Sequence, residues 1–306
     1  MSTAWRREPA EPVEQSLLSP TDPDGREIVY LAHEEMIPTR SSVMTQSPVV
    51  RGCGAAAFQN KQIKASMEDE CVLVPSLRGP HGEPGAFFGV YDGHGGGFVS
   101  KYLATTLHVA VQKRVDDGMP VATALGDAFA SIDMGLEEME EADACGSTAV
   151  VCVVLPTEIF VANIGDSHCL LFNGSRLQRL SADHHVRNDA EINRIKDNQG
   201  IILNHRVSGV SRVTRAFGQN NEKDLIIPTP HLKCVARPSE ASETPAFVVL
   251  VSDGVTDVLS DADIGRYVLR GLVELLWSPD RICRELLGIC RLKRAFDNMT
   301  VVLVLL

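Results

Sequence analysis

The residues of this chain best suited to chemistry are five aspartates that lie where apolar, strand-like runs meet loops. Strand ends on a packed sheet are rigid, so carboxylates held there can converge. Clustered carboxylates repel one another unless a cation lies between them, and Mg²⁺ and Mn²⁺ prefer oxygen ligands. Two such ions about 4 Å apart can hold the reacting oxygens of phosphoryl hydrolysis. The apolar runs cover 87–91, 159–164, 247–251 and 301–306, and the aspartates are Asp92, Asp166, Asp253, Asp257 and Asp297.

The composition is typical of an acidic globular protein with a substantial core. Hydrophobic residues make up 44% of the 306 residues, and 40 acidic against 29 basic side chains give a formal charge of -11. A general nucleic-acid binder needs a basic face, so this charge argues against a nucleic-acid partner. No apolar stretch reaches the roughly 18 residues that span a membrane. The N-terminus has no apolar signal core, so we expect no membrane partner.

Eight cysteines are scattered along the chain without a Cys-x-x-Cys pair. This spacing argues against a zinc site, and it suits a reducing compartment better than a disulfide framework. Cys152 and Cys169 lie in apolar runs and are expected in the core. We therefore expect a cytoplasmic or nuclear protein, and we expect it to work as a monomer.

Two regions are expected along the chain. Residues 1–48 are polar and rich in Pro, Glu and Ser, which predicts a poorly ordered N-terminal arm with one short strand near 28–31. Order is expected from 49 to 306. Apolar spacing predicts helices at 98–114, 121–139, 187–199, 261–276 and 280–292, and strands at 71–74, 87–91, 147–155, 158–164, 168–172, 247–251 and 300–306. Strands in hairpin-like runs and helices in pairs favour an α+β fold with largely antiparallel sheets.

Eight short motifs, in order along residues 49–306, resemble those of metal-dependent Ser/Thr protein phosphatases of the protein phosphatase 2C family. Each motif alone is weak, but eight in the same order are specific. The resemblance makes 49–306 a phosphatase catalytic domain. The motifs are Met67-Glu68-Asp69, Val90-Tyr91-Asp92-Gly93-His94-Gly95-Gly96, Cys145-Gly146-Ser147-Thr148-Ala149, Ala162-Asn163-Ile164-Gly165-Asp166-Ser167, Ala182-Asp183-His184, Val213-Thr214-Arg215-Ala216-Phe217-Gly218, Val251-Ser252-Asp253-Gly254 and Asp297-Asn298-Met299-Thr300.

The resemblance implies a four-layer sandwich, with two central antiparallel β-sheets flanked by pairs of α-helices. A site for two Mg²⁺ or Mn²⁺ ions is expected at one edge of the sandwich. By position in the motifs, Asp92 bridges both ions and the carbonyl of Gly93 binds one of them. Asp253 and Asp297 bind the other ion.

Five further residues take roles from the same resemblance. Glu68 and Asp69 are expected to act through water molecules bound to the metals. Asp166 and Asp257 match carboxylates that the family links to a weaker third ion. His94 matches the proposed general acid, which protonates the leaving serine or threonine oxygen while water attacks phosphorus. The expected reaction is direct hydrolysis of phosphoserine or phosphothreonine in phosphoprotein substrates.

Two departures from the family pattern keep a second function open. Lys64 stands where the family has an arginine that binds the substrate phosphate, and lysine loses the bidentate geometry of a guanidinium. Gln219 stands where the family has an aspartate, which puts the conformation of the substrate loop in doubt. The alternative is a catalytically dead family member that acts as a regulatory binding module. Measured turnover separates the two functions.

Other phosphatase chemistries lack their residues here. A cysteine phosphatase needs an arginine six residues after its cysteine, and none of the eight cysteines has one. The Asp-x-Asp nucleophile of dehalogenase-type phosphatases has the right spacing at Asp22 and at Asp261. The first lies in the polar arm and the second at an expected helix start, neither of which is a strand end.

Overall fold

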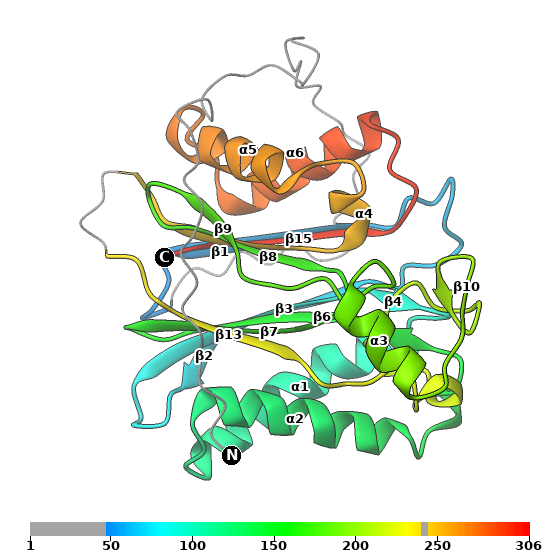
Figure 1. The fold of residues 1–306 in the computed structure, drawn as a ribbon. Coiled ribbons are helices and arrows are strands. Elements are labelled where there is room, and N and C mark those ends of the chain that lie inside the picture. The colour runs from blue at the N-terminus through cyan, green and yellow to red at the C-terminus, as the bar shows by residue number, and fades with distance from the viewer. Residues whose placement is uncertain (1–46, 240–243) are drawn as a thin grey trace.

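Four layers make up the protein, in a computed structural model that describes residues 47–239 and 244–306 (Figure 1). Two five-stranded sheets lie face to face in the middle, and every strand pair within them is antiparallel. The first sheet has the order β1 (Gly52–Phe58), β15 (Met299–Leu305), β14 (Phe247–Val251), β8 (His168–Phe172) and β9 (Leu177–Arg179). The second has the order β13 (His231–Ala236), β7 (Glu158–Ile164), β6 (Ala149–Val154), β3 (Pro84–Tyr91) and β2 (Glu70–Arg78).

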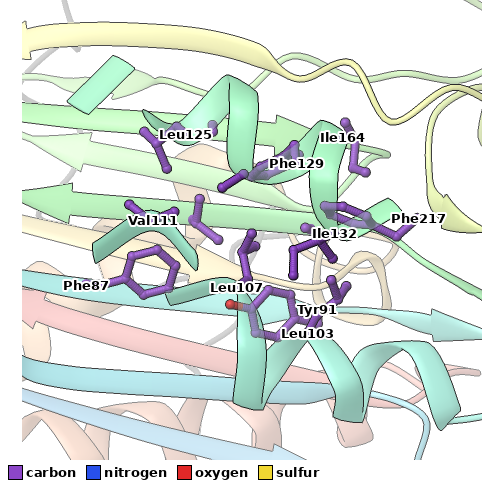
Figure 2. Close-up of a cluster of buried hydrophobic side chains, with 14 of the residues drawn as sticks. Phe87, Tyr91, Leu103, Leu107, Val111, Leu125, Phe129, Ile132, Ile164 and Phe217 are labelled. Carbon is purple, nitrogen blue, oxygen red and sulfur yellow. The ribbon is translucent and has the colours of Figure 1, made fainter. Parts of the chain in front are cut away.

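A pair of helices covers the outer face of each sheet (Figure 1). Helices α1 (Phe98–Asp116) and α2 (Val121–Leu136) pack on the second sheet, and α5 (Asp261–Val273) and α6 (Pro279–Leu292) pack on the first. The buried residues of α1 recur every four positions, at Val99, Leu103, Leu107, Val111 and Val115, which places one apolar stripe against the sheet. Figure 2 shows side chains of this stripe beside Phe87 and Tyr91 of β3.

The central strands are buried on both faces because successive side chains point to opposite sides of a sheet. In β6, Val151 and Val153 belong to the core beneath α1 and α2, whereas Val150 and Cys152 belong to the core between the sheets. The alternation repeats in β15 between the inter-sheet core and the core under α5 and α6. Strands of this kind are rigid, so the residues at their ends have fixed positions.

Smaller elements gather at one end of the sandwich (Figure 1). A three-stranded sheet has the order β12 (Phe217–Gly218), β5 (Gly146–Ser147) and β4 (Gly93–His94). Next to it lie α3 (Asp189–Asp197) and the hairpin of β10 (Ile202–Leu203) and β11 (Arg206–Val207). These elements surround the strand ends that carry the predicted aspartates.

The predicted fold class is confirmed, and the differences are local. Strands β1 and β13 were not predicted, because Gly52–Phe58 consists mostly of glycine and alanine and His231–Ala236 mixes polar and apolar residues without a clear alternation. The loop expected after residue 251 begins with one helical turn, α4 (Asp253–Thr256). The second helix ends at Leu136 rather than at 139. The strand expected near 28–31 lies outside the described residues.

Two further expectations can be compared with the structure. All eight cysteines are free, and Cys152 and Cys169 are fully buried, as expected for core residues. Within 47–239 and 244–306, no helix is both long and apolar enough to cross a membrane.

Candidate active site

One cavity of about 390 Å³ brings most of the predicted site residues together at the end of the sandwich. Glu68, Asp69 and Asp257 do not line it. The lining includes Lys64, Asp92, Gly93, His94, Asp166, Asp253 and Asp297.

The three predicted inner carboxylates come from neighbouring strand ends. Asp92 joins β3 to β4, and its backbone carbonyl accepts a hydrogen bond from the Thr148 amide at 2.9 Å. Asp253 follows β14 and Asp297 precedes β15, its antiparallel neighbour. Because the two strands pair in register, the end of one lies beside the start of the other. Sheet pairing therefore places Asp253 beside Asp297, whereas Asp92 comes from the end of β3 in the other sheet.

Asp92 and Asp253 are half-buried in the cavity wall, and each carboxyl changes the titration of the other. Burial, followed by the charges of Asp253, Asp69 and Asp166, raises the pKa of Asp92 well above its usual range. Burial and the charge of Asp297 raise the pKa of Asp253 to about 6, although a hydrogen bond with Asp92 opposes this shift. A proton shared by the pair would relieve this repulsion, and a bound cation would take the place of that proton.

The two residues predicted for a third ion differ in their surroundings. Asp166 faces the cavity, and burial with the charge of Asp253 raises its pKa to about 7. Asp257 is solvent-exposed, one helical turn beyond Asp253. Partial desolvation raises the pKa of Asp257, and the nearby charges of Arg212 and Arg187 oppose that rise. Of the pair, Asp166 alone is part of the cavity wall.

Asp69 lies behind the cavity and is fixed by two hydroxyl groups. One of its carboxylate oxygens, Oδ2, accepts hydrogen bonds from Ser252 Oγ and Thr300 Oγ1, both at 2.8 Å. Burial raises the pKa of Asp69 to about 7, although these hydrogen bonds oppose the shift. The sequence analysis assigned no role to Ser252 or Thr300. Ser252 directly precedes the predicted ligand Asp253, and Thr300 lies in the same motif as the predicted ligand Asp297.

Glu68 is held mainly through its backbone. Its amide donates to Asn298 Oδ1 at 2.9 Å, and its carbonyl accepts from Ser100 Oγ at 2.5 Å. A Cβ atom on Gly93 would collide with the same carbonyl, so glycine is required where the two segments meet. Asn298 also donates to the carbonyls of Gln59 and Ser66, at 2.7 and 3.1 Å, so it ties the 59–68 loop to the start of β15.

Lys64 and His94 supply the nitrogen groups of the site. Lys64 Nζ forms an ion pair with Asp297 Oδ1 at 2.5 Å. Burial alone would lower the pKa of Lys64, but the hydrogen bond and charge of Asp297 raise it. His94 is half-buried in the cavity wall, and burial lowers its pKa even though a hydrogen bond to Gln219 acts in the opposite direction.

Two arginines of the cavity were missed by sequence reasoning. Arg206 of β11 and Arg212 reach the wall from the segment around the β10–β11 hairpin, together with Ser211. No motif marks them, because the hairpin is short and its arginines look like ordinary surface residues in the sequence. They give the cavity two cationic groups opposite the carboxylates, in a chain whose overall charge is negative.

The chemistry of these residues fits a divalent metal ion. The donors are carboxylate and carbonyl oxygens, which suit Mg²⁺ and Mn²⁺. Their mutual repulsion, seen in the raised pKa values of Asp92, Asp166 and Asp253, would be relieved by a cation. Among the residues that the structure describes, no three histidine, cysteine or acidic side chains already stand in a ready-made ligand arrangement. Binding would therefore replace the proton of the Asp92–Asp253 pair and the Lys64–Asp297 contact.

Comparison with known proteins agrees with this geometry. A family model described as Protein phosphatase 2C matches residues 53–299. Protein phosphatase 1A of Mus musculus is 31% identical over 273 residues, which cover 82% of this chain and 69% of that protein. Protein phosphatase 2C 56 of Arabidopsis thaliana is 35% identical over 205 residues, which cover 62% of this chain and 46% of that protein.

Solved structures show the same fold. A serine-threonine phosphatase 2C from Toxoplasma gondii superposes with a TM-score of 0.69 at 22% identity, and the match covers 88% of this chain and 99% of that one. A C. elegans sex determining protein superposes with a TM-score of 0.72 at 24% identity, covering 83% of this chain and 64% of that one. The predicted family and enzyme class are thus confirmed, and Mg²⁺ or Mn²⁺ dependence is general in this family. This chain belongs to the protein phosphatase 2C family of protein phosphatases.

Proposed function

We propose that this protein hydrolyses phosphoserine and phosphothreonine in proteins by direct attack of water on phosphorus, with the help of divalent metal ions. The observation that carries the proposal is the cavity itself. Carboxylates whose raised pKa values favour binding of a cation line this cavity. Lys64, Arg206 and Arg212 line the same cavity, and their charges suit a phosphate group.

Asp92, the Gly93 carbonyl, Asp253 and Asp297 would hold two Mg²⁺ or Mn²⁺ ions, and Asp166 with Asp257 would hold a weaker third. When bound, such ions neutralise charge on the phosphate and lower the pKa of a water molecule. Glu68 and Asp69 would support this set of ligands from the 59–69 side of the cavity. Asp69 is suited to that role because its two hydroxyl partners fix its orientation.

The remaining side chains would bind substrate and move a proton. Lys64, Arg206 and Arg212 would contact phosphate oxygens as charge-assisted hydrogen-bond donors. His94 would give a proton to the serine or threonine oxygen as its bond to phosphorus breaks. Its lowered pKa makes the imidazolium a stronger acid.

The alternative function, a catalytically dead binding module, draws on Lys64 and Gln219. Lys64 is engaged with Asp297, a predicted metal ligand, instead of being free to meet a phosphate. Against this alternative, each predicted inner carboxylate is present, and all three line the same cavity as His94.

Hydrolysis of a phosphothreonine peptide tests the proposal. The purified protein is titrated with Mn²⁺ and then Mg²⁺, beside Asp92→Asn. We expect metal-dependent turnover that falls by more than about a hundredfold in Asp92→Asn, because even residues that only support metal ligands contribute 10–100-fold. A folded wild-type protein without turnover at millimolar metal would favour the binding module.

Three broader expectations stay predictions. They are the division into an arm at 1–48 and a catalytic domain at 49–306, the cytoplasmic or nuclear location, and the monomeric state. Light scattering coupled to size-exclusion chromatography measures the last of these.

A further inference from the structure

The side chain of Gln219 is bound directly to the ring of His94. Gln219 Oε1 lies 2.7 Å from His94 Nε2, and only 2% of Gln219 is exposed to solvent. A carbonyl oxygen has no hydrogen to give, so the contact is a hydrogen bond only when His94 carries a proton on Nε2. The neutral ring then has its lone pair, and its capacity to exchange a proton, on Nδ1.

The three-stranded sheet at the cavity places these two residues opposite each other. His94 of β4 pairs with Gly146 of β5, and Gly146 also pairs with Gly218 of β12. The Gln219 amide continues the ladder by donating to the Cys145 carbonyl at 2.9 Å. A Cβ atom on Gly146 would lie 2.5 Å from His94 Nε2 and 2.9 Å from Gln219 Cγ, so a glycine is needed beneath the contact.

Gln219 adopts a strained backbone conformation that its surroundings maintain. Its φ of 51° lies in the left-handed region, which costs energy for any residue other than glycine. The buried carboxylate of Asp133 anchors the preceding residue by accepting from the Gly218 amide at 3.0 Å. Lys223 Nζ in turn donates to both Asp133 oxygens at 2.8 Å. A strained backbone conformation that hydrogen bonds to Asp133 maintain beside His94 indicates a functional role for this position.

We propose that Gln219 is a positioning residue for His94, one that fixes the orientation of its ring through the 2.7 Å contact at Nε2. This inference rests on the proposed function. Gln219 was expected to affect only the conformation of a substrate loop, but its side chain contacts His94. Its amide oxygen also keeps a hydrogen-bond acceptor where the family has an aspartate.

Substitution of Gln219 by methionine and by glutamate tests the proposal. Methionine keeps the length and removes the acceptor, whereas glutamate restores an acceptor. All three side chains are unbranched at Cβ, so the backbone strain stays similar. We expect kcat of Gln219→Met to fall at least about tenfold, part of the roughly 10²–10⁴-fold that general acid–base catalysis supplies. KM and Mn²⁺ affinity should not change, and Gln219→Glu should recover most of kcat.

Gln112→Met is the matched control, because Gln112 bonds Arg78 and Asp116 far from the cavity and should keep wild-type kcat. ¹⁵N NMR of His94 at pH 8 provides a readout that does not depend on turnover. The wild-type ring should show the Nε2–H tautomer, and Gln219→Met should show a mixture of tautomers. An inactive wild-type protein with this tautomer shift would reject the proposed function while the Gln219 contact stands. Unchanged kcat and an unchanged tautomer in folded Gln219→Met would overturn the positioning role.

Discussion

Two groups of buried or half-buried carboxylates in this protein differ in the cations around them. Glu191 in α3 accepts hydrogen bonds from Arg215 Nη2 at 2.5 Å and from Arg194 Nη2 at 3.0 Å. Burial alone would raise the pKa of Glu191, but these guanidinium groups lower it to about 2. Asp183 similarly contacts Arg179 and His168, and its pKa is lowered to about 2 against the effect of burial.

Three carboxylates of the cavity show the reverse, whereas a fourth, Asp297, forms an ion pair with Lys64. Within the described ranges, Asp92, Asp166 and Asp253 form no ion pair with lysine or arginine, and burial with mutual repulsion raises their pKa values. A carboxylate that stabilises the fold has its cation within the chain, whereas a carboxylate without one is suited to a cation from solution. The contrast distinguishes Glu191 and Asp183 from Asp92, Asp166 and Asp253 without reference to any motif.

The largest effect on stability should come from a change in Glu191, whose carboxylate is paired with two arginines. Glu191→Gln removes the charge that Arg215 and Arg194 share, so it should lower the free energy of unfolding by about 3–5 kcal/mol, as for other broken buried ion pairs. Urea denaturation measures the change. Asp127→Asn is the control, because Asp127 pairs with Arg114 at the surface and should cost below about 1 kcal/mol. Equal costs at both sites would mean that the Glu191 cluster is not structurally special.

The pH dependence of stability should separate the two groups. Glu191 stabilises the fold above its ordinary pKa of 4.5, and this contribution is lost as the pH falls toward 2. Asp166, with a pKa raised from 3.8 to about 7, contributes stability below pH 3.8 that is lost as the pH rises to 7. With a chelator present, we expect the unfolding temperature to rise as the pH falls from 7 to about 5, and then to fall below about 4.5.

Mn²⁺ should abolish the rise in unfolding temperature between pH 7 and about 5, because a bound ion takes the place of the protons on the cavity carboxylates. Thermal unfolding followed by circular dichroism, with and without Mn²⁺, measures both profiles. Identical profiles in chelator and in Mn²⁺ would contradict the distinction between the two groups.

The sequence alone could predict the layers and the inner carboxylates, because both depend on regular patterns. Apolar strands buried on both faces can be recognised in the sequence, and an aspartate at the end of such a strand has a fixed place. Strand β1 was missed because its glycines and alanines have low strand propensity, yet Gly54 must be small where the start of α6 packs on it.

The contacts made by long side chains could not be predicted. Arg206 and Arg212 enter the cavity through the path of one hairpin, and Ser252 and Thr300 meet Asp69 only because β14 pairs with β15 in register. Gln219 looked like a departure from a substrate-loop pattern, and its contact with His94 depends on a three-stranded sheet whose strands are two residues long. No local pattern encodes such pairings.

The smallest effect should come from Lys64, which forms an ion pair with the predicted metal ligand Asp297. Lys64→Arg restores a bidentate donor for phosphate, so KM should fall roughly three- to tenfold, equivalent to about 1 kcal/mol. Steady-state kinetics at saturating Mn²⁺ measures it. Lys61→Arg, at an exposed position outside the cavity, serves as the control and should keep the wild-type KM. An unchanged KM in Lys64→Arg would mean that Lys64 does not contact phosphate.

Proton release on Mn²⁺ binding tests the central claim most directly. If the cavity carboxylates hold protons because they lack a cation, an ion that binds them must displace those protons. Isothermal titration calorimetry at pH 6, repeated in buffers of different ionisation enthalpy, counts the protons released. We predict release of protons with each Mn²⁺ bound to the wild type, and reduced release and affinity in Asp92→Asn. Mn²⁺ binding without proton release, or no binding at millimolar Mn²⁺, would contradict the account.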